Sequence, residues 1–110
     1  MSDNRRQFPR FEFDKPVQYH PKQGVDSKGA LAHDISMGGI KITVHEFMPL
    51  GSVLELGIYV AELGRNVAVK GKVVWIRENI YSERFDIGLE FIQDEQAASL
   101  IEAITKKRQR

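Results

Sequence analysis

Three arginines near the N-terminus are the first residues whose types and spacing could do chemistry. Arg6 and Arg10 stand four residues apart, and Arg5 directly precedes them. Because Pro9 favours an extended backbone at the residue before it, the segment is expected to be an arm rather than a helix. Guanidinium groups donate in a planar fork that matches phosphate oxygens or the O6/N7 edge of guanine, and they stack on purines. A solvated basic terminus has the same composition, so the arginines alone leave both interpretations open.

A second group of polar residues lies at 34–39, in the sequence Asp-Ile-Ser-Met-Gly-Gly. Asp34 can accept hydrogen bonds from the N1 and N2 donors of a guanine, and Ser36 can donate to a phosphate. Gly38 and Gly39 permit a positive φ and a close backbone approach. An ordinary turn that satisfies its own backbone uses the same residue types. The spaced pattern is rarer by chance than an arginine pair, and it favours a ligand rim between two strands.

Six short alternating segments must position these residues. Apolar and polar residues alternate through most of residues 11–91, which is typical of half-buried antiparallel strands separated by turns. Tyr19, Trp75, Phe85 and Phe91 occupy the apolar phase of their segments, so we expect them in the core. The predicted strands are 11–20, 27–34, 39–45, 54–60, 67–77 and 85–91.

From residue 94 the apolar residues recur at the spacing of one helical face, with Asp94 as the expected N-cap. The pattern predicts a single, mainly β domain: a six-stranded antiparallel β-barrel with one C-terminal α-helix. We expect a flexible arm at 1–12, the barrel at 13–93, and the helix with a basic tail at 94–110. The 34–39 motif then lies on the barrel.

Composition and charge narrow the possible functions. The chain has 110 residues and no cysteine, which predicts one domain without disulfides or thiol catalysis. Its net charge is +1, but the first ten residues carry +2 and the last five +4, which leaves −5 for the rest. Generic nucleic-acid binding needs a long basic stripe, so this distribution disfavours it. No stretch predicts a membrane span or a signal peptide, and we expect a soluble, cytoplasmic protein.

The spacing of titratable residues gives no support for catalysis or metal binding. His20, His33 and His45 fall on separate strand ends without the spacing of metal ligands. His33, Asp34 and Ser36 match a catalytic triad by type. Neighbours on a regular strand face opposite sides of the sheet, however, and cannot form that relay. We expect a protein that is not an enzyme, with no catalytic residue, no metal and no cofactor.

Together the two motifs resemble the signature of the PilZ domain, a bacterial receptor family for the second messenger cyclic di-GMP. The family's RxxxR is Arg6 to Arg10 here, and its DxSxxG is Asp34 to Gly39. The later segments 71–75 and 87–91 are similar to the closing strands of the family. The resemblance spans nearly the whole chain. It implies a PilZ-like barrel of the split-barrel type that stands alone, without an appended catalytic or output domain.

The resemblance also implies a role for each motif residue. In the family the two motif arginines bind guanine and phosphate, while the aspartate of the second motif reads a guanine edge. The serine contacts phosphate or the neighbouring backbone, and the glycine holds the turn open. An arginine directly before RxxxR favours an intercalated pair of cyclic di-GMP molecules over a single one. The expected ligand-binding residues are Arg5, Arg6, Arg10, Asp34, Ser36, Gly38 and Gly39.

These inferences predict a cyclic di-GMP receptor or adaptor. The arm would close over the DxSxxG turn when the nucleotide binds, and its ordering would create a surface for an unidentified downstream protein. One alternative is a protein-interaction barrel that binds no nucleotide, in which ligand would change nothing at the arginines. Another is a small OB-like nucleic-acid binder, which would retain oligonucleotides with a steep salt dependence.

Overall fold

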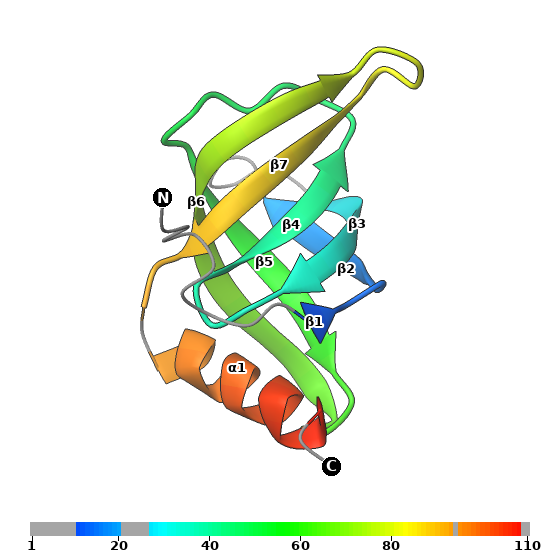
Figure 1. Ribbon diagram of the computed structural model, residues 1–110. Coiled ribbons are helices and arrows are strands. Elements are labelled where there is room, and N and C mark those ends of the chain that lie inside the picture. The colour runs from blue at the N-terminus through cyan, green and yellow to red at the C-terminus, as the bar shows by residue number, and fades with distance from the viewer. Residues whose placement is uncertain (1–10, 21–26, 94, 109–110) are drawn as a thin grey trace, which may run out of the picture.

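The alternating segments form antiparallel strands and the last segment forms a helix (Figure 1). The computed structural model describes residues 11–20, 27–93 and 95–108. In chain order the elements of these residues are β1 (Phe11–Glu12), β2 (Pro16–His20), β3 (Lys28–Ile35), β4 (Gly39–Val44), β5 (Val53–Val60), β6 (Arg65–Asn79), β7 (Arg84–Phe91) and α1 (Glu95–Arg108).

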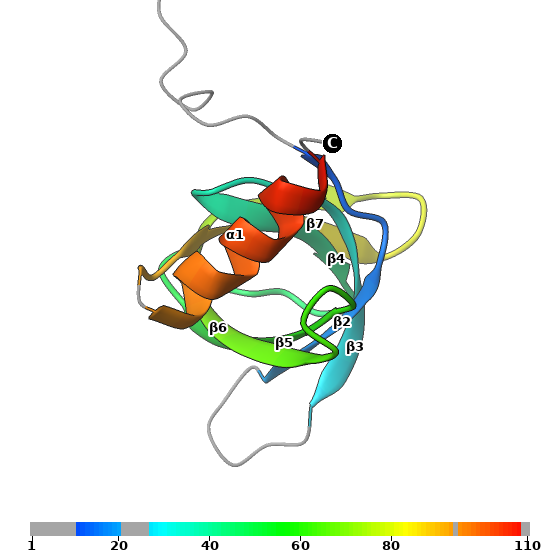
Figure 2. The same ribbon diagram turned by 90° about the horizontal axis from the view of Figure 1, so that it is seen from below.

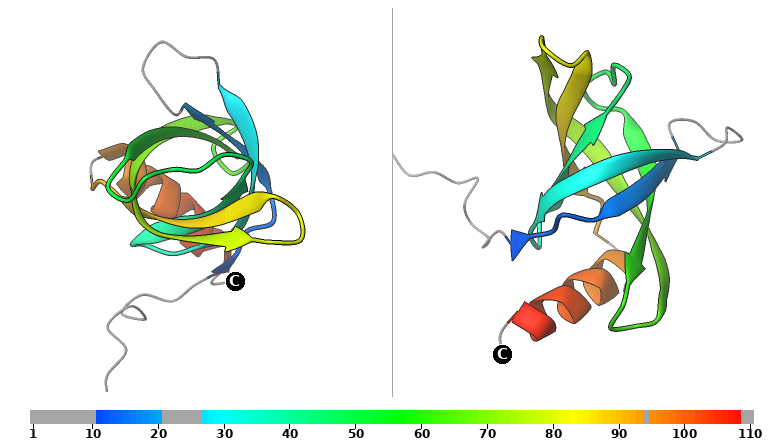
Figure 3. Two further views of the ribbon diagram at one scale, coloured as in Figure 1. Left: turned by 90° about the horizontal axis from the view of Figure 1, so that it is seen from above. Right: turned by 90° about the vertical axis from the view of Figure 1, so that its right-hand side faces the viewer.

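Six strands close into a barrel, which is visible end-on in the left view of Figure 3. Neighbours run antiparallel in the order β3-β2-β5-β6-β7-β4, and a pairing of β3 with β4 completes the ring. The predicted six-stranded barrel with one C-terminal helix is confirmed. Phe11 and Glu12, which the sequence placed at the end of the arm, form the two-residue β1 against β3.

Alternate side chains of every barrel strand fill the interior, because successive residues of a strand point to opposite faces. Strand β5 shows this period without interruption: Leu54, Leu56, Ile58 and Val60 are buried, and the residues between them are not. Burying one large apolar side chain completely stabilises the folded state by about 1.5–3 kcal/mol. Further members of the core are Val17, Tyr19, Ile40, Ile42, Val44, Val67, Val69, Val73, Ile87, Leu89 and Phe91.

Helix α1 lies across one end of the ring, as the view from below in Figure 2 shows. It packs against β5 and β6. Its buried face carries Ala97, Leu100, Ile101 and Ile104, which follow the spacing of a single helical stripe. The expected N-cap, Asp94, lies outside the described residues.

Strands β6 and β7 extend past the ring as a hairpin, which projects above the barrel in the right view of Figure 3. Strand β6 has 15 residues and exceeds the predicted 67–77 by two residues at each end. At the turn, Ile80 and Tyr81 are 75% and 93% exposed. The end of the hairpin is therefore exposed to solvent and is not part of the core.

A polar cluster ties the end of β4 to β2 and β3. The hydroxyl of Tyr19 donates to Glu46 (3.1 Å), and the ammonium of Lys28 donates to both oxygens of the same carboxylate (3.1 and 2.9 Å). The bond from Lys28 lowers the pKa of Glu46 most, against partial desolvation that acts to raise it. Burial, followed by the bond to Glu46 and its charge, raises the pKa of Tyr19. The buried phenol is thus held neutral and the carboxylate ionised.

Candidate functional site

The Asp-x-Ser-x-x-Gly motif forms the turn between β3 and β4. The N–H of Ser36 donates to the carbonyl oxygen of Gly39 (2.9 Å), and the N–H of Gly38 donates to Oγ of Ser36 (3.1 Å). The N–H of Phe91 donates to the carbonyl oxygen of Gly38 (2.8 Å), which binds the turn to the end of β7. No hydrogen bond donated by the hydroxyl of Ser36 is seen among the described residues, and the residue is 5% exposed.

Gly39 is required by close packing rather than by its backbone conformation. A Cβ at this position would lie 2.0 Å from the carbonyl oxygen of Leu89 on β7. Among the described glycines, Gly51 and Gly64 have a positive φ and Gly39 does not. Of the two properties that glycine permits, the close backbone approach is used at this position and the positive φ is not. The glycine instead lets the turn lie directly against β7.

Asp34 lies on the outer face because β3 carries a bulge. Ala32 and Ile35 are both fully buried, with two residues between them instead of one. The pairing with β4 shifts between Ala32 and Asp34, and one extra residue there keeps the alternation intact on either side. His33 and Asp34 are both partly exposed. The expectation that they face opposite sides of the sheet is wrong.

Trp75 also lies outside the core, which corrects the prediction from the sequence. The pairing of β6 with β7 shifts between Val73 and Trp75, and the indole is 37% exposed. Gly88 makes room for it, since a Cβ there would lie 2.1 Å from the indole Nε1. Gly88 pairs with Lys41, and Lys41 pairs with Asp34. Trp75, Gly88, Lys41 and Asp34 thus form one row across four strands, which we call the Asp34 row.

The other three aromatic residues lie as expected or nearly so. Tyr19 and Phe91 are 1% and 3% exposed, so both belong to the core. Phe85 is partly buried and packs against the core, with the ring of Phe47 edge-on to it at a centroid distance of 6.0 Å. Of the four aromatic residues, only Trp75, which follows the shift in register, lies outside the core.

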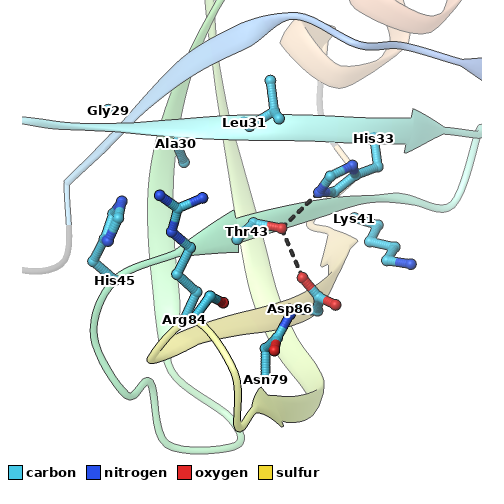
Figure 4. Close-up of a pocket in the computed structure, with 11 residues that line it drawn as sticks. Gly29, Ala30, Leu31, His33, Lys41, Thr43, His45, Asn79, Arg84 and Asp86 are labelled. Atoms are coloured by element: carbon cyan, nitrogen blue, oxygen red, sulfur yellow. Dashed lines mark hydrogen bonds between the residues drawn. The ribbon is translucent and has the colours of Figure 1, made fainter.

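A chain of hydrogen bonds crosses the outer face from β3 to β6, and its first two bonds are drawn in Figure 4. Nε2 of His33 lies 2.6 Å from Oγ1 of Thr43, and Thr43 donates to Oδ1 of Asp86 (2.7 Å). Arg77 donates to Oδ2 of Asp86 (3.2 Å). Because Thr43 has one hydroxyl hydrogen and gives it to Asp86, the imidazole Nε2 must donate to Thr43.

Asp86 is ionised at neutral pH within this chain. Partial burial acts to raise its pKa. Hydrogen bonds from Thr43 and Arg77, with the positive charges of Lys41 and Arg77, outweigh the burial and hold the pKa of this carboxyl below its ordinary value. Both carboxylate oxygens already accept a hydrogen bond, so Asp86 is a positioning group on this surface.

A groove of about 500 Å³ runs over β4 and begins at the Asp34 row. It lies between β3 on one side and β7 with its hairpin on the other (Figure 4). No sequence motif marks this groove, because its lining residues come from four strands and two loops. Its polar lining includes His33, Lys41, Thr43, His45, Arg84 and Asp86.

The predicted arginines at positions 5, 6 and 10 lie outside the described residues. The described chain begins at Phe11, which pairs with Ile35. Ile35 stands between Asp34 and Ser36 of the second motif. The structure thus gathers four predicted site residues in one turn: Asp34, Ser36, Gly38 and Gly39.

The described residues contain no group of three or more histidine, aspartate or glutamate side chains placed to hold a metal ion. In the same part of the chain, no helix combines the length and the apolar character needed to span a bilayer.

The observed architecture defines a class of protein: a closed six-stranded antiparallel barrel with a helix across one end and a polar turn at its outer face. The sequence matches the PilZ domain over residues 4–106, so the chain belongs to the PilZ domain family. No curated protein matches it.

Solved structures share this fold. The inhibitor of motility MotI/DgrA of Bacillus subtilis is 23% identical with a TM-score of 0.68, and the match covers 94% of this chain and 52% of that one. The PilZ domain of CeSA from a cellulose-synthesizing bacterium is 16% identical with a TM-score of 0.68, covering 91% and 98%. YcgR of Escherichia coli, in complex with c-di-GMP, is 15% identical with a TM-score of 0.66, covering 96% and 46%. The chain thus spans about half the length of MotI and YcgR.

Proposed function

We propose that this chain is a receptor for cyclic di-GMP and binds the nucleotide between its N-terminal arginines and the DxSxxG turn. The observation that carries the proposal is the pairing of Phe11 with Ile35 inside the second motif. Because Phe11 directly follows Arg10 in the sequence, the RxxxR segment ends one residue before this pairing. The PilZ-fold proteins YcgR of Escherichia coli and PlzA of Borreliella burgdorferi were solved in complex with c-di-GMP, which supports the choice of ligand.

The turn offers complementary groups for a guanine nucleotide. Asp34 lies on the outer face and accepts hydrogen bonds from N1 and N2 of a guanine. The hydroxyl of Ser36, positioned by the bond from the N–H of Gly38, donates to a phosphate oxygen. Gly39 keeps the turn against β7, Asp34 belongs to β3, and Ser36 is held by hydrogen bonds within the turn.

The arginines supply positive charge, which the residues of the DxSxxG turn do not carry. Arg6 and Arg10 bind phosphate and the O6/N7 edge of guanine through their planar forks, and both contacts are charge-assisted. Arg5 stands directly before the motif and favours two intercalated nucleotides per chain. This assignment rests on the family resemblance and on the attachment of the segment at Phe11.

The mechanism follows from the order of these parts along the chain. The arm closes across the turn when the nucleotide binds, and its ordered form presents a new surface to a downstream protein. That protein must bind one of the two states more tightly for the nucleotide to act as a signal. The chain acts by binding and performs no reaction.

Calorimetric titration of cyclic di-GMP into the full chain tests the proposal. Arg6→Ala and Arg10→Ala should each weaken binding by at least about 1.5 kcal/mol, roughly tenfold, because a charge-assisted hydrogen bond is lost. Arg65→Ala is the matched control, since Arg65 is exposed at the β5–β6 turn. Two nucleotides bound per chain would support the role of Arg5.

Three results would contradict the assignment in different ways. Wild-type affinity in both arginine variants would remove the arm from the site. No binding by the wild type, in calorimetry and in a competition assay, would leave a protein-interaction barrel. Tight, strongly salt-dependent retention of oligonucleotides would favour a nucleic-acid binder, against the net charge of −5 outside the two basic ends.

A further inference from the structure

The groove over β4 is continuous with the proposed nucleotide site. Lys41 belongs to the Asp34 row and also lines the groove, which reaches from there to His45 and Arg84. Four residues along a strand correspond to about 13 Å. Its volume of about 500 Å³ lies within the range of small-molecule sites. The groove is therefore long enough for a nucleotide group that extends away from Asp34.

The groove exists because β3 and β4 separate. Their pairing ends at Leu31 and Thr43, and the earlier residues of β3, 28–30, pair with β2 alone. Gly29 enlarges the opening, since a Cβ there would meet no atom within 4 Å. Figure 4 shows the side chain of Arg84 reaching into this space from β7, toward the gap between β3 and β4. The floor of the groove is thus part of the barrel wall.

The free charge of the groove is positive. Lys41 and Arg84 form no hydrogen bond or ion pair with any described residue. Asp86 is the one carboxylate among the described lining residues, and it is already engaged by Thr43 and Arg77. The charge of Lys41 also acts on Asp86, but neither cation has a hydrogen-bond partner among the described residues. Two cations facing one cavity, one with a planar fork, match the oxygens of a phosphate group.

We propose that this groove is an anion subsite in which Lys41 and Arg84 bind a phosphate of the guanine nucleotide beyond the half held at Asp34. The inference rests on the proposed function and extends it to residues outside both sequence motifs. The phosphate belongs either to the far half of the same cyclic di-GMP or to a second molecule of it. The subsite adjoins Asp34, because Lys41 pairs with Asp34 across β3 and β4.

Titration of cyclic di-GMP into the full-length Lys41→Gln/Arg84→Gln variant tests the subsite. At low ionic strength the affinity should fall about tenfold, and the loss should shrink as salt is added, because the contacts are electrostatic. If the phosphate comes from a second molecule, the stoichiometry should fall from two to one instead. Lys70→Gln/Arg65→Gln is the matched control, because both residues are exposed on β6 and neither lines the groove.

Thermal unfolding of both variants checks that the barrel is intact. A Lys41→Gln/Arg84→Gln variant with wild-type affinity and stoichiometry would overturn the subsite while leaving the receptor proposal in place. An equal loss in the control variant would also overturn it, since the effect would then come from net charge. Failure of the wild type to bind cyclic di-GMP would overturn both proposals together.

Discussion

At the scale of single residues, Asp34 owes its outward position to one extra residue in β3. The bulge leaves Ala32 and Ile35 in the core and turns both residues between them outward. The carboxylate is therefore presented by a strand rather than by a loop, which restricts its motion. A strand-borne acceptor suits discrimination between bases, because it can be placed within a few tenths of an ångström.

Asp34→Ala should reduce selectivity for guanine. A carboxylate accepts from both N1 and N2 of guanine, whereas adenine offers no donor at those two positions. We expect the ratio of affinities for cyclic di-GMP and cyclic di-AMP to fall about tenfold, measured by calorimetry with both nucleotides. Glu55→Ala, an exposed carboxylate on β5, should leave the ratio unchanged. An Asp34→Ala variant that rejects cyclic di-AMP as strongly as the wild type would refute the role.

Gly39→Ala should destabilise the fold. The added methyl group would meet the backbone of Leu89, which cannot move without breaking the pairing of β4 with β7. We expect the free energy of unfolding to fall by about 1–3 kcal/mol in urea titrations, as in other overpacked sites. Gly57→Ala is the control, since a Cβ there meets no atom within 4 Å. Equal stability of the two variants would show that β4 and β7 tolerate a wider separation.

At the scale of elements, the bond chain from His33 to Arg77 joins four strands of the outer face. Asp86 is its anionic centre, and its carboxylate is 18% exposed. The folded pKa of Asp86 lies below its ordinary value of 3.8. The ionised carboxylate therefore stabilises the fold above that value, and this contribution is lost as the pH falls through the folded pKa.

Asp86→Asn should therefore lower the free energy of unfolding at neutral pH by about 1 kcal/mol. The difference in the free energy of unfolding between this variant and the wild type should become smaller as the pH falls below 3.8. Urea unfolding across this pH range measures it, with Glu78→Gln as a control for loss of an exposed carboxylate on β6. If the difference in the free energy of unfolding between the two proteins did not change with pH, the amide would be disrupting packing rather than removing a charge.

The two bulges determine which side chains depart from the alternation of the sequence. Alternation predicted the strands and most of the core, because a regular strand has a period of two. Trp75 and His33 depart from it, because each adjoins a one-residue shift in register. Alternation assumes a constant register and cannot locate such a shift. The glycine at position 88, opposite the indole, is a signal that becomes readable only once the pairing is known.

At the scale of the whole molecule, α1 completes the core by covering one end of the barrel. The side chain of Leu100 is fully buried among residues of the barrel core. Leu100→Ala should lower the free energy of unfolding by about 2–5 kcal/mol, because it leaves a cavity. Gln96→Ala, on the exposed face of the helix, should change it by less than about 0.5 kcal/mol. Urea unfolding followed by circular dichroism measures both, and similar values would mean that the helix adds little to the core.

The candidate site could be predicted only in part. The DxSxxG turn is contiguous in sequence, so its residues were found from their spacing alone. Lys41 and Arg84 lie 43 positions apart and meet at one groove only because β4 pairs with β7 and separates from β3. No local sequence pattern predicts that Lys41 and Arg84 line the same groove. The arm remains an expectation from the sequence, because its arginines lie outside the described residues.

Trp75 gives the molecule an intrinsic optical reporter. It is the sole tryptophan of the chain, and its indole lies partly exposed in the Asp34 row. Indole emission depends on the polarity and the quenching groups around the ring. When tryptophan is excited selectively over the three tyrosines, the emission of the unlabelled protein reports on one place, the Asp34 row on the outer face. Nucleotide binding and its rate become measurable by fluorescence without attaching a dye.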